Sequence, residues 1–128
     1  MTKNRPRILI IDDDTGTIEL LTHKLSMEGY VVISAQNGKD GLAKASKVKP
    51  AVCILDIKLP GMNGTEVLGK LKELDPNLEV IMATAHADIE TVDVSLRKNA
   101  FDYLLKPFDI EYLVSMIKRA LENQKLQE

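Results

Sequence analysis

Acidic residues follow two apolar segments of this chain, at the point where each segment ends. Asp12 and Asp13 come directly after residues 8–11, and Asp56 comes directly after residues 52–55. Both segments are typical of strands buried in a parallel sheet, whose C-terminal ends meet at one edge. We therefore expect the three carboxylates to share one shallow cleft. Like charges that close stay ionised only beside a cation, and a site built only of oxygen ligands favours Mg²⁺.

A hydroxyl and an amine are expected at the same edge. Thr84 follows the apolar residues 79–83, and Lys106 follows residues 101–105. The alternative interpretation is that the acidic residues only cap helices and turns and face water, as aspartate often does. That interpretation accounts for Asp14, but it does not explain why a lysine and a threonine reach the same edge.

Five apolar strands alternate with five amphipathic helices along the chain. The expected strands are residues 7–11, 30–34, 51–55, 79–83 and 101–105. The expected helices begin at residues that favour N-terminal caps, namely Asp14 or Thr15, Asn37, Asn63, Asp88 and Asp109. This alternation with short connections predicts an α/β fold, a doubly wound parallel sheet with helices on both faces. We assign residues 1–121 to one domain and residues 122–128 to a polar C-terminal tail, as the end of the last helix or the start of a linker.

Apolar residues at helical spacing predict which side of each helix faces the sheet. Leu74 in the third helix is among the residues expected to face inward, and Leu96 is expected on one face of the fourth helix with Ile89 and Val92. The fourth helix has the lowest propensity of the five, because it is rich in β-branched residues. Asn99 is expected to adopt the left-handed conformation that ends this helix.

Length, charge and cysteine content limit the classes of protein to which this chain can belong. A chain of 128 residues has the size of one domain and can bury a core without metal or disulfide staples. A net charge of −2 gives no reason to expect direct nucleic-acid binding, and no apolar segment is long enough to span a membrane. The lone cysteine, Cys53, lies in an apolar strand, which fits the reducing cytoplasm.

In order along the chain, these motifs resemble the receiver domain of two-component response regulators. The matching features are Asp12-Asp13, Asp56 with Pro60 and Gly64 behind it, Thr84-Ala85, and Lys106-Pro107-Phe108. The segment from Thr84 to Phe108 is similar to receivers joined to AAA+ transcription activators. The resemblance covers the chain from end to end and implies a flavodoxin-like sheet of order 2-1-3-4-5.

The resemblance also implies roles for the site residues. Asp56 would be the phosphoryl acceptor, Asp13 a direct Mg²⁺ ligand and Asp12 a ligand acting largely through water. The backbone carbonyl of Lys58 would be a further ligand, with Mn²⁺ as an alternative ion, and the phosphoryl group would contact Thr84, Ala85 and Lys106. The residue types suit this chemistry, because phosphoryl transfer depends on positioning and on cations around the phosphoryl oxygens. A carboxylate nucleophile gives an acyl phosphate.

Regulation and partners are likewise implied by the family. Thr84 and Tyr103 would form a switch that remodels the face of the fourth helix, fifth strand and fifth helix, through which such domains dimerise. Lys58 and His86 would tune the lifetime of the acyl phosphate. The donor would be a sensor histidine kinase or a phosphotransfer protein. The chain would catalyse only its own phosphorylation and dephosphorylation, with no membrane or direct nucleic-acid partner.

Other protein classes fit the sequence less well. A phosphatase of the haloacid dehalogenase type has a second aspartate where this chain has Lys58, and a flavodoxin has a Ser/Thr/Gly-rich loop where it has Asp12 to Asp14. A receiver-like scaffold that is not phosphorylated stays open, although such domains tend to lack an acidic residue or the lysine. His23 and His86 are not spaced as a metal pair, and His23 is expected on the outer side of the first helix.

Overall fold

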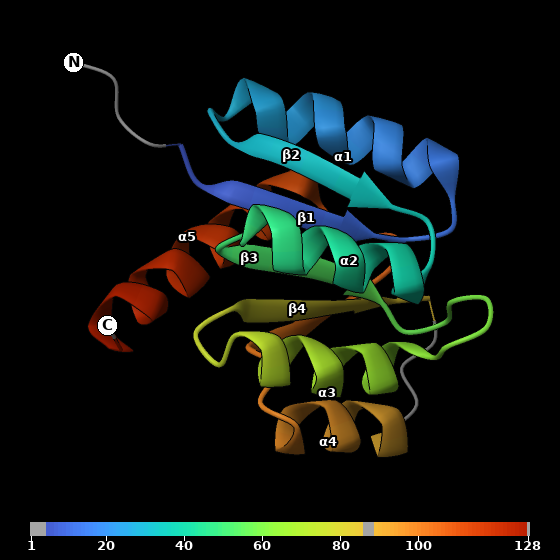
Figure 1. Ribbon diagram of the computed structural model, residues 1–128. Coiled ribbons are helices and arrows are strands. Elements are labelled where there is room, and N and C mark those ends of the chain that lie inside the picture. Colours follow the sequence, from blue (N-terminus) through green and yellow to red (C-terminus); the bar gives the residue numbers. More distant parts are fainter. Residues whose placement is uncertain (1–4, 86–88, 128) are drawn as a thin grey trace.

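The computed structural model describes residues 5–85 and 89–127 as strands alternating with helices (Figure 1). The strands are β1 Arg7–Ile11, β2 Val31–Ala35, β3 Val52–Asp56, β4 Glu79–Thr84 and β5 Asp102–Leu105. The helices are α1 Thr15–Met27, α2 Gly38–Val48, α3 Gly64–Leu74, α4 Ile89–Arg97 and α5 Ile110–Gln127. All strands pair in parallel, in the order β2-β1-β3-β4-β5. The predicted flavodoxin-like fold is therefore confirmed.

Alternating residues of the strands build one apolar core on each face of the sheet. Ile8 and Ile10 of β1 pack on the side that α1 and α5 cover, whereas Leu9 and Ile11 pack on the side of α2 and α3. In Figure 1, α2 and α3 lie in front of the strands and α5 lies behind them. Cys53 is fully buried in β3, and burial raises the pKa of its thiol. Helices on both faces leave the C-terminal edge of the sheet as the open surface where side chains can meet.

Polar side chains cap the helices that start at this edge. The side chains of Asp14, Asn37 and Asn63 each accept a hydrogen bond from the backbone N–H three residues further on, at 3.1, 2.8 and 3.0 Å. These bonds satisfy donors that a helix leaves unpaired at its start, and they confirm the three predicted caps. The predicted cap at Asp88 lies outside the described residues.

Four strands, β2 to β5, differ from the prediction by one residue at one or both ends. Asp56 and Thr84 are the last residues of β3 and β4, although their polarity placed them just beyond the apolar strands. Backbone pairing continues through both positions, with Asp56 opposite Ala83 and Thr84 opposite Leu105. Both polar residues are therefore held by the rigid sheet and not by a loop.

The inward assignment of Leu74 is wrong. Leu74 is 53% exposed, because it is the last residue of α3 and no further turn shields it, and Leu96 in the last turn of α4 is 45% exposed. Asn99 does adopt the left-handed conformation, with φ 69°, as predicted. His23 is exposed, also as predicted.

The last helix continues through most of the predicted tail. Asn123 donates a hydrogen bond to the carboxylate of Glu79, and Gln124 donates to the carbonyls of Ala51 and Asn77 at 3.0 and 2.7 Å. These contacts fix the end of α5 to the N-terminal edge of the sheet, opposite the acidic residues. Among the described residues, none of the helices combines the length and the hydropathy that a membrane span requires.

Candidate functional site

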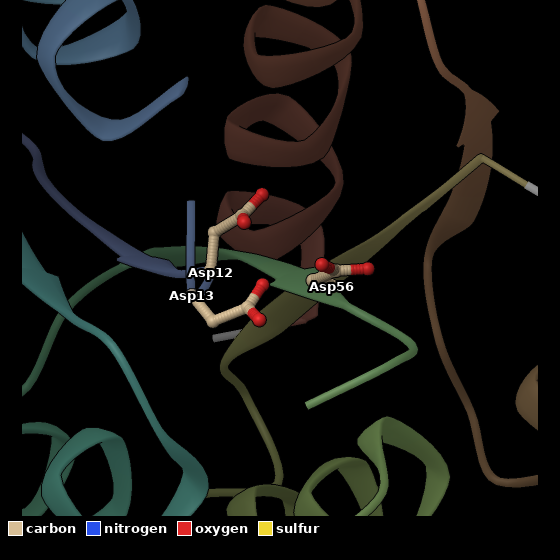
Figure 2. A group of neighbouring side chains, drawn as sticks. All are labelled: Asp12, Asp13 and Asp56. Carbon is tan, nitrogen blue, oxygen red and sulfur yellow. The ribbon is translucent and has the colours of Figure 1, made fainter. Parts of the chain in front are cut away.

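The two central strands bring the acidic residues together. β1 and β3 pair in register with Ile11 opposite Leu55, so the next residues, Asp12 and Asp56, lie side by side at the edge of the sheet. Figure 2 shows these two side chains grouped with Asp13 at the ends of β1 and β3. One carboxylate oxygen from each of the three residues lies within 4.8 Å of the other two. The predicted acidic cluster is thus assembled by strand pairing.

Local hydrogen bonds orient the two buried carboxylates of the cluster. Asp12 is 3% exposed and Asp56 is 8% exposed, whereas Asp13 is open to solvent. Asp12 Oδ1 accepts from the backbone N–H of Asp14 at 2.9 Å, and Asp56 Oδ1 accepts from that of Lys58 at 3.3 Å. Each carboxylate is therefore fixed by the turn that follows its own strand, and its second oxygen remains for another partner.

Lys106 supplies a positive charge to both buried carboxylates. Its Nζ lies 2.6 Å from Asp12 Oδ2 and 3.5 Å from Asp56 Oδ2. The backbone N–H of Lys106 donates to the carbonyl of Thr84 at 2.7 Å, which anchors the lysine to the end of β4. The sequence predicted that Lys106 would lie at the same edge as the carboxylates, but its close contact to Asp12 was not predicted.

Burial and charge shift the titration of these groups. Burial raises the pKa of Asp56, and the negative charge of Asp12 raises it further, against the lowering effect of Lys106. Burial disfavours the charge on Lys106, but its hydrogen bond and Coulombic attraction to Asp12, together with those to Asp56, outweigh burial and raise its pKa. Lys106 therefore offsets part of the burial and of the repulsion by Asp12 that oppose the ionised form of Asp56.

The donor set fits a small, hard cation. Its members are carboxylates that converge on one point, two of them held in place by turns, with solvent on the side of Asp13. Mg²⁺ prefers one or two carboxylates and keeps several waters, and an open cluster of this kind allows both. The carbonyl of Lys58 lies in the same turn as Asp56, and its role as a ligand stays a prediction.

The remaining predicted residues surround this centre. Thr84 ends β4 in a buried position, and Ala85 follows it and is exposed. Tyr103 on β5 is opposite Met82, so it lies diagonally from Thr84 on the same face of the sheet, with 37% of its surface exposed. The side chain of Lys58 is exposed. His86 lies outside the described residues.

An apolar groove of about 350 Å³ adjoins the site, between the start of α1 and the start of α5. It is lined by Thr17, Leu20, Leu21, Ala85, Lys106, Pro107, Phe108 and Ile110. Leu20 is 51% exposed at this groove. Sequence reasoning missed the groove. The available signal was Leu20, an apolar residue that does not fit the helical spacing of the inner residues Ile18, Leu21 and Leu25.

Comparison with known proteins places the chain in a family. A sequence model of the response regulator receiver domain matches residues 8–118. The chain belongs to this family. Sporulation initiation phosphotransferase F of Bacillus subtilis is 36% identical to this receiver domain over 115 residues, which cover 90% of the chain and 93% of the relative. Regulatory protein AtoC of Escherichia coli is 34% identical over 122 residues, or 95% of the chain, but the match spans only 26% of AtoC.

Solved structures agree with this assignment. A CheY-like response regulator receiver domain protein from Methanospirillum hungatei superposes on the chain with a TM-score of 0.95 and 38% sequence identity. The match covers 98% of this receiver domain and 100% of that protein. The acidic cluster and Lys106 therefore lie at the C-terminal edge of a receiver fold, as the sequence motifs indicated.

Proposed function

We propose that this receiver domain accepts a phosphoryl group on Asp56 in a reaction that depends on Mg²⁺. The observation that carries the proposal is the convergence of Asp56 with Asp12, Asp13 and Lys106 at one edge of the sheet. Asp56 is held rigidly at the end of β3, and the amine of Lys106 lies 3.5 Å from its Oδ2. A carboxylate beside a fixed cation is suited to take up a phosphoryl group, because the cation balances the negative charge of the phosphoryl oxygens in the acyl phosphate.

The bond changes in this proposal are simple. A carboxylate oxygen of Asp56 forms a bond to phosphorus while the bond from phosphorus to the donor breaks, and the donor keeps the electron pair. Lys106, held by Asp12 at 2.6 Å, would contact the transferred oxygens, as would the hydroxyl of Thr84 and the N–H of Ala85. Asp13 and Asp56 would hold the metal ion directly, with Asp12 through water and with the carbonyl of Lys58. When bound, Mg²⁺ supplies positive charge to the carboxylates and the phosphoryl oxygens.

The donor that we propose is a sensor histidine kinase or a phosphotransfer protein. The groove beside the site supports a protein donor, because it is largely apolar and one of its walls is Lys106. A donor seated there places its phosphohistidine next to the acceptor. We place the exchange in the cytoplasm, with the chain acting as a signalling domain that catalyses only its own phosphorylation and dephosphorylation. Lys58 and His86 remain the proposed modulators of the acyl phosphate lifetime.

Intact-mass spectrometry after incubation with acetyl phosphate tests the function. With Mg²⁺ present we expect one phosphoryl adduct per chain, and with EDTA the rate should fall by at least about tenfold, because the metal balances charge that Lys106 alone cannot. Mg²⁺ alone should also raise the melting temperature through its binding to the folded chain. An unchanged rate in EDTA would refute the metal site.

We further propose that phosphorylation changes the face formed by α4, β5 and α5. This face carries partly exposed apolar side chains, namely Val94, Tyr103, Leu105 and Tyr112. Thr84 ends the neighbouring strand on the same side of the sheet as Tyr103, so a movement of the threonine toward the phosphoryl group opens space for the ring. Relatives such as AtoC support an output in transcription regulation, through a homodimer or another module.

The variant Thr84→Ala tests this switch. With the phosphoryl mimic beryllofluoride, sedimentation should show self-association of the wild-type chain and about tenfold weaker association of Thr84→Ala, which loses a coupling of roughly 1.4 kcal/mol. The matched control is Thr22→Ala on α1, away from the proposed face, and it should associate like the wild type. Equal association of the two variants would refute the coupling.

A further inference from the structure

Gly64, the first residue of α3, lies directly against the strand end that carries Asp56. A Cβ atom on Gly64 would lie 2.5 Å from the carbonyl oxygen of Asp56, 2.6 Å from the Cα of Ile57 and 2.9 Å from the carbonyl oxygen of Ile57. All three are backbone atoms, so no side chain can rotate away to make room. The N–H of Gly64 also donates to the carbonyl of Ile57 at 2.6 Å.

The backbone that Gly64 contacts is the one that orients the acceptor. The next peptide N–H, that of Lys58, donates to Asp56 Oδ1 at 3.3 Å, which closes a turn around the carboxylate. On its other side this turn is fixed to β4, because the N–H of Ile57 donates to the carbonyl of Ala83 at 3.2 Å. Residues 56–58 are thus held between β4 and the start of α3, and a push from α3 moves the Asp56 carboxylate relative to the rest of the site.

We propose that Gly64 is a positioning residue, whose missing side chain lets α3 hold residues 56–58 in the geometry that Mg²⁺ and the phosphoryl group require. This inference rests on the proposed function of Asp56. A methyl group at Gly64 forces a displacement of roughly half an ångström, because the closest contact must grow from 2.5 Å to about 3.0 Å. Loss of such support around a metal ligand typically costs about 10- to 100-fold in metal affinity, and small misplacements cost similar factors in rate.

The test compares Gly64→Ala with Gly69→Ala, a substitution of the same kind five residues further along the same helix. A Cβ atom on Gly69 would meet only the side chain of Lys98, at 3.8 and 3.9 Å, which is ordinary contact. We expect Gly69→Ala to bind Mg²⁺ like the wild type. Gly64→Ala should bind Mg²⁺ at least about tenfold more weakly and take up the phosphoryl group at least about tenfold more slowly. Calorimetric titration with Mg²⁺, circular dichroism and intact mass give the three readouts.

The outcomes separate this inference from the proposed function. Equal Mg²⁺ affinity in folded Gly64→Ala and Gly69→Ala would overturn the positioning role. If the wild type and Gly69→Ala neither bind Mg²⁺ nor incorporate a phosphoryl group, the proposed function itself fails.

A measurement on the wild-type chain covers the case in which Gly64→Ala does not fold. In amide NMR spectra recorded during a Mg²⁺ titration, the Gly64 resonance should shift with the same midpoint as those of Asp13 and Asp56. The reason is that the N–H of Gly64 is hydrogen-bonded to the turn that holds Asp56. The Gly69 resonance should stay in place. A Gly64 resonance that does not move with the metal would overturn the inference.

Discussion

Asp56→Ala is expected to abolish phosphoryl incorporation from acetyl phosphate while leaving the domain folded. Asp56 is the cluster carboxylate that combines a fixed position at the end of a strand with an oxygen, Oδ2, whose contact to Lys106 is long, at 3.5 Å. Asp12 lies at almost the same depth, but its Oδ2 is already bonded to Lys106 at 2.6 Å and its Oδ1 to the N–H of Asp14. Asp13 is exposed and can rotate away from an incoming phosphorus. Removal of Asp56 therefore leaves no carboxylate positioned for the transfer.

Intact-mass spectrometry measures this loss directly, and Asp75→Ala is the matched control. Asp75 caps the end of α3 at the opposite edge of the sheet, where its side chain accepts from the backbone N–H of Asn77 at 2.9 Å. The control variant should incorporate the phosphoryl group at the wild-type rate. An adduct that persists in Asp56→Ala would assign the acceptor to another residue and remove the basis of the proposed function.

Most of the fold could be predicted because its signals are local. Buried strands, capping residues and the left-handed Asn99 each depend on a few neighbouring residues. The strand ends at Asp56 and Thr84 were predicted one residue too early, since apolar character was used to mark strands. The backbone pairing that extends a strand through a polar residue is supplied by the neighbouring strand. The polar residues of the site therefore gain their rigidity from contacts that are remote in sequence.

The side-chain contacts within the site could not be predicted from the sequence, for a related physical reason. Motif spacing indicates which strand end carries each residue, but it does not set side-chain distances. Lys106 and Asp12 are 94 positions apart in the sequence. Their pairing depends on the turn after β5 and on the hydrogen bond from the backbone N–H of Lys106 to the carbonyl of Thr84. The contact of Gly64 with residues 56–57 likewise depends on the path of the loop before α3. Sequence reasoning identified the residues, and the structure adds which of them touch.

Replacing Lys106 by methionine is expected to lower the free energy of unfolding in metal-free buffer by roughly 2 kcal/mol. Removing one partner of a buried ion pair typically costs about 3–5 kcal/mol, and the side chain of Lys106 is 21% exposed, so solvent reduces that cost. Methionine keeps most of the apolar stem, so the loss reports on charge and not on packing. The carboxylates of Asp12 and Asp56, at 5% and 11% side-chain exposure, would then repel each other without a cation between them.

Mg²⁺ and a second substitution distinguish the loss of the Lys106 charge from a general loss of stability. If Lys106 balances the carboxylates, Mg²⁺ should raise the melting temperature of Lys106→Met more than that of the wild type, because the ion replaces a missing charge. Adding Asp56→Asn to Lys106→Met should recover part of the lost stability, which a double-mutant cycle measures. Lys98→Met is the control, since the exposed side-chain amine of Lys98 donates to the carbonyl of Thr65, at 3.3 Å, and not to a carboxylate of the cluster. If Lys106→Met and Lys98→Met unfold alike and respond alike to Mg²⁺, Lys106 is not the cation that stabilises this cluster in the metal-free domain.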